Sequence, residues 1–474
     1  MAGITEMGFR PLLRVPNIGA NPHRNSAYIC FRLIVLRMRQ TQRRVFTMAG
    51  RPDTATATAA PHRTARLTGA VCAATVLALA AAGCSSSASD STSSSSAAAA
   101  GSSATGSAGS CGTVPTEPFK DATGLVRALG AKYEAAYSGY SGTVQKSKWA
   151  DWKPTKKSGF TIGISESQLS NPYQTLINTS LQKYLKADGY KVIDLVSTNE
   201  VTNQIAQFNQ LITDKVDLII YQPLASGFDS VVDKAAAAGI PSISMLNNVV
   251  DANTVNVVPN SFAAGEAQAA AVAKALSGKG SILGVHGIKG VPIDTDTFTG
   301  AKAALALCPN IKLDDSIYTD FSPTTAQTNV QHYLAANPTK TIGGVLEGGP
   351  MTTGVISAFQ KSSQTVPTIA DNGLTVGGVA YWNAHQSSYQ GVGLFNPGDG
   401  LANAVAQVAH HMLAGSGVKV SDIVIDPPLV TNSNLSSFYK SGFAVGNAAT
   451  VTEGDVNQSF ATSSYIDGFF NSTN

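Results

Sequence analysis

Charged side chains are scarce in this 474-residue sequence, because Asp, Glu, Lys and Arg together make up only 13% of it. The formal net charge of +3 is misleading, since residues 1–83 hold eleven Arg against two acidic residues and leave 22 basic and 28 acidic residues in the remainder. A mildly acidic chain lacks the positive surface that phosphates require, which excludes DNA and RNA as partners. The hydrophobic content of 43% is ample for globular cores.

The sequence after residue 84 also lacks the motifs of common enzyme classes: the Gly-x-Ser-x-Gly elbow, the Walker loop, the three-glycine dinucleotide fingerprint and the His-Glu-x-x-His zinc motif. His286 and the pair His410-His411 have no evident partner, and isolated imidazoles more often form local hydrogen bonds than catalyse. Asp294 and Asp296 suggest calcium, but the remaining oxygen ligands of a calcium loop are missing. We therefore expect no catalytic residue, no cofactor and no metal.

The longest apolar run near the N-terminus, residues 67–82, is too short for a stable membrane span. It follows a basic stretch and ends at Ala-Ala-Gly before Cys84, which is the pattern of a bacterial lipoprotein signal peptide whose Cys receives the lipid. We expect translation to start at Met48, with 1–47 as a wrongly assigned upstream extension and 48–83 as the signal peptide. A conventional signal peptide or a retained anchor is the alternative, and each places the protein outside the cytoplasm.

Cysteine is rare, with five residues in the whole chain. Cys30 and Cys72 precede the expected cleavage point and Cys84 is the expected lipidation site, so Cys111 and Cys308 remain. In an oxidising compartment two remaining cysteines predict one disulfide, which would pin the N-terminal extension to the second lobe. Two free thiols are the alternative, because sequence separation does not establish the geometry of a bridge.

Composition divides the rest of the chain into segments. Residues 84–113 are almost wholly Ser, Ala, Gly and Thr and predict a flexible tether. Residues 114–157 form an N-terminal extension with one plausible helix near 122–136. From residue 158 on, short β-rich runs alternate with amphipathic helical windows, which predicts βα units with parallel strands in doubly wound sheets. A Ser/Asn-rich break near 253–261 favours two such lobes over a single closed barrel.

Several fragments occur in a distinctive order: Ser-Asn-Pro-Tyr at 170–173, Leu-Ile-Ile-Tyr-Gln-Pro at 218–223, Ala-Gly-Ile-Pro-Ser-Ile at 238–243, Asn260, Gly265, Gly300 and Gln-Gly-Val-Gly-Leu-Phe-Asn-Pro at 390–397. With this spacing, residues 159–429 resemble the sugar-binding type I periplasmic binding proteins of the ribose-binding kind. The resemblance implies two Rossmann-like α/β lobes that are joined by three hinge segments, close on one ligand and deliver it to an ABC permease. The implied bounds are 158–260 plus 396–422 for lobe 1, 261–395 plus 423–445 for lobe 2, and 446–474 for a C-terminal tail.

Ligands of open α/β sheets bind beyond the carboxyl ends of the strands, so the loops there are the expected site. The resemblance implies that Tyr173 stacks on a sugar face while Asn171 bonds to hydroxyl groups. The other expected ligand contacts are Tyr221, Gln222, Asn247, Thr295, Asp296, Glu347, Asn372 and Phe395. Each also has a simpler interpretation: Asn171 as a helix cap, the tyrosines as core or surface aromatics, and the polar strand-end residues as turn formers.

The sequence departs from the family pattern at several of these positions. Where the family has an Asp-Arg pair after the fourth strand, this sequence has Leu246-Asn247. The position of the family's Arg before Gly300 corresponds to Thr-Asp-Thr at 295–297. The family's Asn-Asp after the eighth strand is replaced by Gly348-Gly349. These changes imply a less charged and roomier site than one for ribose. The expected function is a monomeric, membrane-anchored solute receptor for import, with a carbohydrate as ligand. The alternatives are a sensor that presents its ligand to a membrane receptor and a surface α/β hydrolase.

Overall fold

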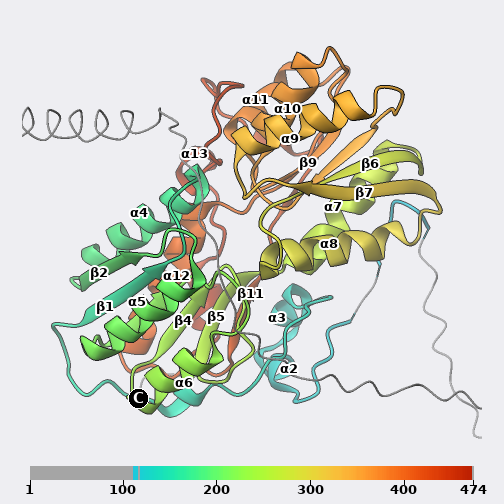
Figure 1. Ribbon diagram of the computed structural model, residues 1–474. Coiled ribbons are helices and arrows are strands. Elements are labelled where there is room, and N and C mark those ends of the chain that lie inside the picture. Colours follow the sequence, from blue (N-terminus) through green and yellow to red (C-terminus); the bar gives the residue numbers. More distant parts are fainter. Residues whose placement is uncertain (1–109, 116–117, 472–474) are drawn as a thin grey trace, which may run out of the picture. The chain divides into compact units, whose positions relative to one another are not determined.

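The computed structural model describes residues 110–115 and 118–471. Within them the strands form two separate six-stranded sheets, each with helices on both faces (Figure 1). The prediction of two doubly wound α/β lobes is therefore confirmed, and the single-barrel alternative is wrong. The expected upstream extension, the signal peptide and Cys84 lie outside the described residues.

The first lobe contains a wholly parallel sheet with the order β11-β5-β4-β3-β1-β2. Its strands are β1 (Thr161–Glu166), β2 (Lys191–Val196), β3 (Leu218–Tyr221), β4 (Ser242–Met245), β5 (Thr254–Pro259) and β11 (Asp422–Ile425). One apolar core joins the sheet to helices α4 (Pro172–Ala187) and α12 (Gly398–Leu413), and a second core joins its other face to α5 (Val201–Thr213) and α6 (Asp229–Ala237).

The second lobe repeats this plan with the strand order β12-β10-β9-β8-β6-β7. Its strands are β6 (Lys279–His286), β7 (Asn310–Tyr318), β8 (Gly344–Glu347), β9 (Thr368–Asn372), β10 (Val392–Leu394) and β12 (Leu429–Val430). The edge strand β12 runs antiparallel to β10, which the purely parallel prediction missed. The helices are α7 (Ser261–Ala275), α8 (Pro292–Leu305), α9 (Pro323–Ala336), α10 (Thr352–Lys361) and α11 (Val376–Ala384), followed by the short 3-10 helix η3 (Leu435–Ser437).

The chain passes between the lobes after β5, between β10 and α12, and between β11 and β12. The expected return to lobe 2 at residue 423 comes too early, because β11 pairs with β5 in the first sheet up to Ile425. Lobe 2 resumes at β12 instead. The described part of the expected tail, 446–471, is not separate either, since Val451 is buried in lobe 2 whereas Phe460 and Phe469 are buried in the core of lobe 1.

Two local predictions also need correction. The break expected near 253–261 contains strand β5, in which the buried Asn256 side chain bonds to both backbone groups of Val249. The helix expected over 122–136 is two short helices, α2 (Leu125–Leu129) and α3 (Ala131–Ala136). Gly130 separates them with φ at 105°, a conformation that residues with a Cβ rarely adopt.

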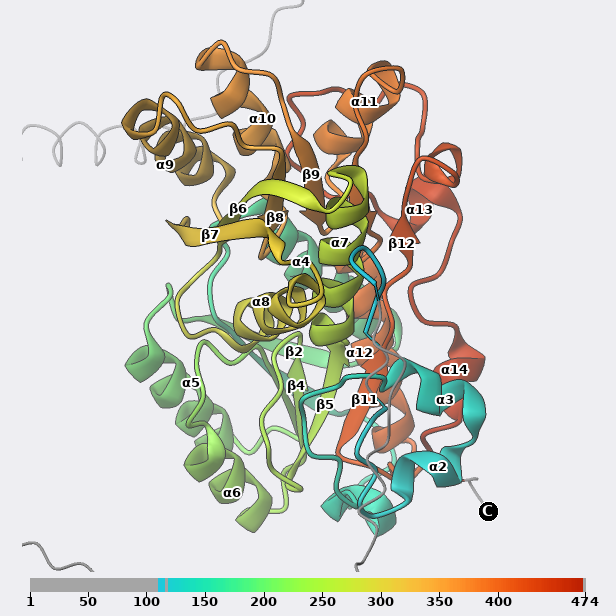
Figure 2. The ribbon, with the colours of Figure 1, turned by 90° about the vertical axis from the view of Figure 1, so that its right-hand side faces the viewer.

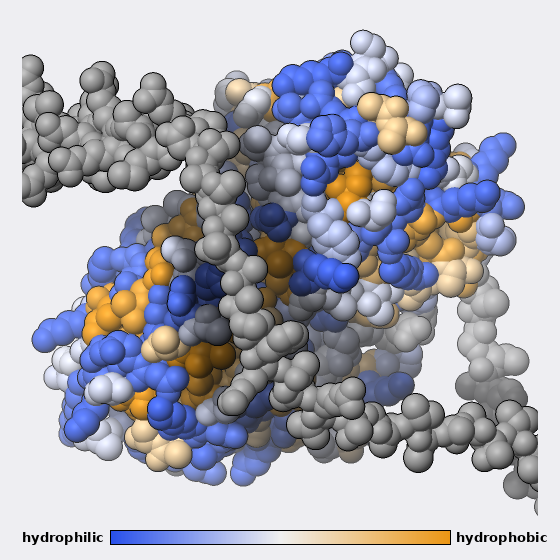
Figure 3. Space-filling model, viewed as in Figure 1, coloured by the Kyte–Doolittle hydropathy of each residue, from blue (hydrophilic) through white to orange (hydrophobic). Residues whose placement is uncertain are grey.

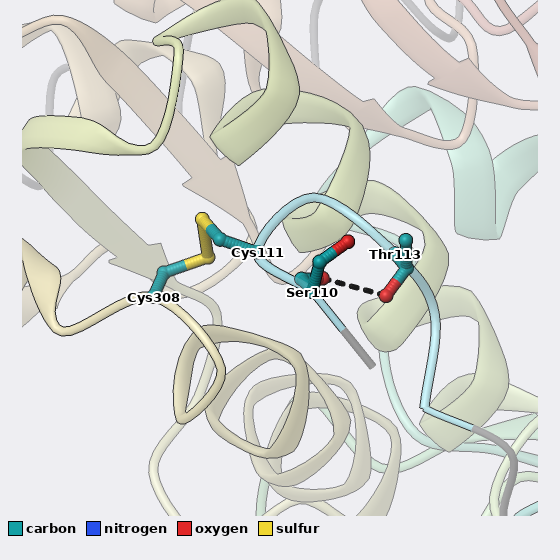
Figure 4. Close-up of a disulfide and its surroundings, with 4 residues drawn as sticks. All are labelled: Ser110, Cys111, Thr113 and Cys308. Carbon is teal, nitrogen blue, oxygen red and sulfur yellow. Dashed lines mark hydrogen bonds between the residues drawn. A yellow bond between two sulfur atoms is a disulfide. The ribbon is translucent and has the colours of Figure 1, made fainter. Parts of the chain in front are cut away.

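The N-terminal extension packs on the first lobe (Figure 2). Side chains from α2, α3 and the 3-10 helix η2 (Lys148–Asp151) enter the same apolar core as β11 and helix α14 (Ser463–Asp467). Just before the extension, Cys111 forms a disulfide with Cys308, which lies in the loop between α8 and β7 (Figure 4). A further short helix, α13 (Glu453–Val456), precedes α14.

Candidate ligand-binding cleft

A cavity lies between the two lobes, where the carboxyl ends of both sheets meet. In the space-filling view, apolar surface is exposed in the recess between the lobes (Figure 3). The residues that line the cavity are Asn171, Tyr173, Gln174, Gln222, Leu246, Val291, Ile293, Phe321, Gly348, Gly349, Pro350, Asn372, Gly373 and Asn396.

The first lobe contributes an aromatic ring and three amides. Asn171 caps α4, because its Oδ1 accepts the N–H of Gln174 at 2.9 Å, and its Nδ2 donates to Oε1 of Gln174 at 2.7 Å. Pro172 at the first helical position fixes the same helix start, which points the ring of Tyr173 at the cavity. The Tyr173 hydroxyl and Oε1 of Gln222 are buried without a hydrogen-bond partner among the described residues. A ligand that reached either atom would supply its missing hydrogen-bond partner.

The second lobe contributes Phe321, which follows β7 and has a left-handed φ of 56°. A Cβ at Gly287 would lie 1.9 Å from the Phe321 ring, and a Cβ at Gly349 would lie 2.6 Å from it. The ring therefore occupies a slot that only glycine at both positions permits. Asn372 at the end of β9 and Asn396 after β10 supply further amides, and Oδ1 of Asn396 has no partner within the described part of the chain.

Two buried carboxyl groups end the neighbouring strands β8 and β9. Glu347 accepts a hydrogen bond from Thr352 Oγ1 at 2.6 Å, and Asp371 accepts bonds from the backbone and hydroxyl of Thr375 at 2.7 Å each. Burial raises the pKa of Glu347 well above its usual value, and the neighbouring Asp371 raises it further. Burial also raises the pKa of Asp371 to about 6. Glu347 is fully buried and is not among the residues that line the cavity.

A buried His-Asp pair positions the loop between β6 and α8. His286 Nδ1 and Asp294 Oδ2 lie 2.7 Å apart, and Asp294 Oδ1 accepts the N–H of Gly287 at 2.8 Å. A Cβ at Gly348 would lie 1.9 Å from that carboxylate, so Gly348 allows the loop to pack against Asp294. The His286 ring stacks on Phe298 and on Tyr318, with ring centroids 3.6 and 4.7 Å apart. No pattern in the sequence indicates that His286 has this carboxylate partner.

Two expected contacts, Tyr221 and Phe395, lie one residue away from the cavity lining. Tyr221 is fully buried in the core beneath α5 and α6, where it packs against Phe208 and Phe228. Phe395 is buried against Phe438. Their chain neighbours Gln222 and Asn396 line the cavity instead, because side chains at the end of a strand alternate between its two faces.

The remaining expected contacts make other bonds. Asn247 is buried beside the cavity, where its Nδ2 donates to Pro223 O at 2.9 Å and its Oδ1 accepts the N–H of Ile293 at 3.1 Å across the lobes. Thr295 is exposed and its hydroxyl donates to Val291 O. Asp296 bonds to Ser141 of the N-terminal extension. None of these three side chains lines the cavity.

The structure brings Asn171, Tyr173, Gln222 and Asn372 together and adds residues that the sequence did not indicate: Gln174, Leu246, Val291, Ile293, Phe321, Pro350, Gly373 and Asn396. The five amide side chains of the lining are each only 5–7% exposed, so the two lobes close over the cavity. No lining residue in the described part of the chain has a charged side chain. Hydrogen bonds to neutral polar groups and contacts with apolar surface are the interactions that this site offers.

Two further features were sought in the residues that the structure describes: a metal-binding group of side chains and a membrane-spanning helix. No group of three or more His, Cys, Asp or Glu side chains in 110–115 and 118–471 is placed to hold a metal ion. In the same residues no helix is both long and apolar enough to cross a bilayer.

Two α/β lobes, three crossings of the chain and a cavity between the carboxyl ends of the sheets define the architecture of a two-lobe periplasmic binding protein. Residues 162–417 match the model of the family described as periplasmic binding protein domain. Because this match covers more than half of the sequence, the chain belongs to that family, whose members are extracytoplasmic solute-binding proteins without enzymatic activity. The resemblance inferred from the sequence is confirmed.

Individual relatives agree with this assignment. The chain is 26% identical over 279 residues to the xylitol-binding protein of Mycolicibacterium smegmatis, a match that covers 58% of this chain and 78% of the relative. It is 25% identical over 237 residues to a ribose import binding protein of Bacillus subtilis, a match that covers 49% of this chain and 76% of the relative. A solved ABC transporter solute-binding protein of Bacillus halodurans with bound myo-inositol has the same fold, with a TM-score of 0.55, 22% identity, and coverage of 60% of this chain and 98% of that one.

Proposed function

We propose that this protein captures a neutral carbohydrate or polyol between its lobes and delivers it to an ABC permease. The observation that carries the proposal is the lining of the cavity, which combines amides from both lobes with two aromatic rings and has no charged side chain among the described residues. Planar amides bond to hydroxyl groups, and aromatic faces suit the C–H groups of a sugar ring. The named ligands of the relatives, xylitol, ribose and myo-inositol, are all neutral polyhydroxy compounds.

The roles of the contacts follow from their positions. Tyr173 stacks on one side of the ligand and Phe321 contacts it from the other lobe, while Gln222 and Asn396 use their unpartnered oxygens to accept hydrogen bonds from its hydroxyl groups. Asn372 adds an amide from lobe 2. A ligand that touches both lobes gains these contacts only when the lobes are closed, so binding shifts the hinge equilibrium towards closure.

We propose that the protein binds its ligand without catalysing a reaction. The carboxyl groups of Glu347 and Asp371 are buried and bonded to threonine hydroxyls, and Asp294 is bonded to His286. A charged ligand such as a sugar acid would enter a site without a counter-charge, which costs far more than binding a neutral ligand. We further propose that the protein acts as a monomer outside the cytoplasm, attached to the membrane through a lipid on Cys84.

A thermal-shift screen followed by calorimetry tests the ligand class. Neutral pentoses, hexoses, pentitols and inositols are compared with sugar acids, amino acids and nucleosides at equal concentration. A ligand present at a hundred times its Kd stabilises the native state by about 2.7 kcal/mol, which a melting curve resolves. We expect stabilisation by at least one neutral polyhydroxy compound. Stabilisation by charged compounds alone would contradict the proposal.

A further inference from the structure

The branched aliphatic residues of the cavity lining, Leu246, Val291 and Ile293, are called its aliphatic edge below. Leu246 follows β4 of the first lobe, whereas Val291 and Ile293 lie at the start of α8 in the second. The side chain of Asn247, next to Leu246, accepts the N–H of Ile293 at 3.1 Å, which holds the two loops together. Leu246 and Val291 are 6% and 4% exposed, so a ligand edge placed there is removed from water.

This edge offers no free hydrogen-bond donor from its backbone. The N–H of Leu246 donates to Val257 O at 3.1 Å, the N–H of Val291 donates to Ile288 O at 3.2 Å, and the N–H of Ile293 is used by Asn247.

The nearest polar side chain is occupied as well. Both ends of the Asn247 amide are bonded, one to Pro223 O and the other to Ile293 N–H. The carbonyl of Val291 already accepts the N–H and the hydroxyl of Thr295, at 3.1 Å each. None of these groups is free to bond to a ligand hydroxyl directed at this edge, and a buried hydroxyl without a partner costs about 1–3 kcal/mol.

We propose that the cavity selects a neutral carbohydrate with a deoxygenated edge, such as the methyl group of a 6-deoxyhexose. The inference rests on the proposed function and refines its ligand class. The amides and aromatic rings hold the hydroxylated part of the ligand, and the aliphatic edge of Leu246, Val291 and Ile293 receives the methyl group.

Calorimetry with sugar pairs that differ by one hydroxyl group tests this specificity. The pairs are D-fucose with D-galactose, L-fucose with L-galactose, and L-rhamnose with L-mannose. In at least one pair we expect the deoxy sugar to bind about 5 to 150 times more tightly than its parent, which corresponds to the cost of one buried, unpartnered hydroxyl. Val291→Thr replaces a methyl group of the edge by a hydroxyl of nearly equal volume and should reduce the preference for the deoxy sugar. Val250→Thr, at an exposed position, should leave that preference unchanged.

The outcomes separate this inference from the proposed function. If other neutral sugars or polyols bind but no pair favours its deoxy member, the inference on the aliphatic edge is wrong and the proposed function stands. If D-galacturonate binds more tightly than every neutral sugar, both are wrong.

A second inference rests on an independent feature, the path of the N-terminal extension across the hinge. The extension is fixed to the first lobe by buried aromatic residues: the Tyr140 hydroxyl donates to Asp422 Oδ1 at 2.7 Å, and Trp149 Nε1 donates to Asn253 O at 2.7 Å. Phe119, near its start, packs against Tyr137 and Tyr140.

The extension also contacts the first crossing between the lobes. The Asn260 Nδ2 group donates to the carbonyls of Ala136 and Ser138, at 2.9 and 2.7 Å, at the point where the chain leaves β5 for α7. A Cβ at Gly139 would lie 2.7 Å from the ring of Phe262 in α7. The extension is therefore packed against the hinge itself.

The other end of the extension is covalently joined to the second lobe through the disulfide of Cys111 and Cys308 (Figure 4). Only eight residue steps separate Cys111 from Phe119, and an extended chain of that length spans at most about 29 Å. The disulfide thus sets an upper limit on how far Cys308 of lobe 2 can move from the Phe119 anchor on lobe 1.

We infer that the disulfide of Cys111 and Cys308, through the short chain connection from Cys111 to Phe119, acts as a strap that restricts opening of the cleft. Exclusion of widely open conformers raises the population of binding-competent ones, because apparent affinity scales with the fraction of molecules that are competent to bind.

Small-angle scattering of the protein without ligand tests the strap. We expect a larger radius of gyration after reduction with a phosphine, and the same increase in Cys308→Ser and in Cys111→Ser without reductant. Reductant should then leave the scattering of both variants unchanged. Circular dichroism spectra must match between the oxidised and reduced forms, so that unfolding is not mistaken for opening. Identical scattering of the oxidised and reduced protein, or a smaller radius after reduction, would overturn the inference.

Discussion

Replacement of Tyr173 by Phe has opposite expected effects on stability and on binding. The Tyr173 hydroxyl is buried and has no hydrogen-bond partner among the described residues, and burial raises the pKa of its phenol. A buried, unsatisfied polar group costs about 1–3 kcal/mol. Tyr173→Phe removes that group and keeps the ring, so the ligand-free protein should become more stable by about 1 kcal/mol or more.

The same substitution should weaken binding of a carbohydrate that bonds to the hydroxyl. Loss of that bond leaves a ligand group unpaired, and a penalty of 1–3 kcal/mol corresponds to about a 5-fold to 150-fold loss of affinity. Tyr173→Ala also removes the stacked ring, which contributes about 0.5–1.5 kcal/mol beyond its area, and should weaken binding further.

Tyr221 provides the matched control for this experiment. It is equally buried, but its hydroxyl donates to Thr254 Oγ1 at 3.3 Å and its side chain does not line the cavity. Tyr221→Phe should therefore leave affinity unchanged and should not stabilise the fold. Urea unfolding and calorimetry measure both quantities. If Tyr173→Phe binds as the wild type does and gains no stability, the assignment of a free hydroxyl to this cavity is refuted.

Three further predictions follow from individual residues. Cys84→Ser should abolish labelling by a fatty-acid analogue, and retained labelling would exclude lipidation at Cys84. Burial raises the pKa of Glu166 to about 8, so the folded chain holds a proton that the unfolded chain releases from about pH 4.5, and the free energy of unfolding should fall as the pH rises to about 8. In urea unfolding, Glu166→Gln should flatten this decline, whereas Glu200→Gln at an exposed position should not. An unchanged slope in Glu166→Gln would count against the assignment. Gly349→Ala should displace the Phe321 ring and lower ligand affinity about tenfold or more. Gly446→Ala, where a Cβ meets no atom, should leave affinity unchanged. Equal affinity of both variants would show that Phe321 does not contact the ligand.

The periodicity of the sequence predicted the lobes well, because buried parallel strands and amphipathic helices leave strong local signals. Strand β5 was missed for a tertiary reason. Its Asn256 looks like a loop residue in the sequence, yet in the structure its amide bonds to Val249 and to Asp422 of the distant strand β11. A buried amide in a strand is tolerated only with such partners, and these are invisible in a local window.

The candidate site was predicted in the right loops but not always at the right residue. Gln222 lines the cavity while Tyr221 does not, and the same shift by one residue separates Asn396 from Phe395. Successive side chains at a strand end point to opposite faces, so the loop alone does not decide which of two neighbours meets the ligand. Phe321 gave no signal of its own, because its place depends on glycines at positions 287 and 349 in other loops.

The central claim is that one ligand is held by both lobes. The most direct test is calorimetry on Tyr173→Ala from lobe 1 and Asn372→Ala from lobe 2, with the neutral sugar or polyol that gives the largest thermal shift, together with scattering to follow compaction. We predict that each variant loses affinity about tenfold or more and that the ligand compacts the wild-type protein at a concentration that leaves both variants open. Unchanged affinity in both variants would place the ligand elsewhere and contradict the account.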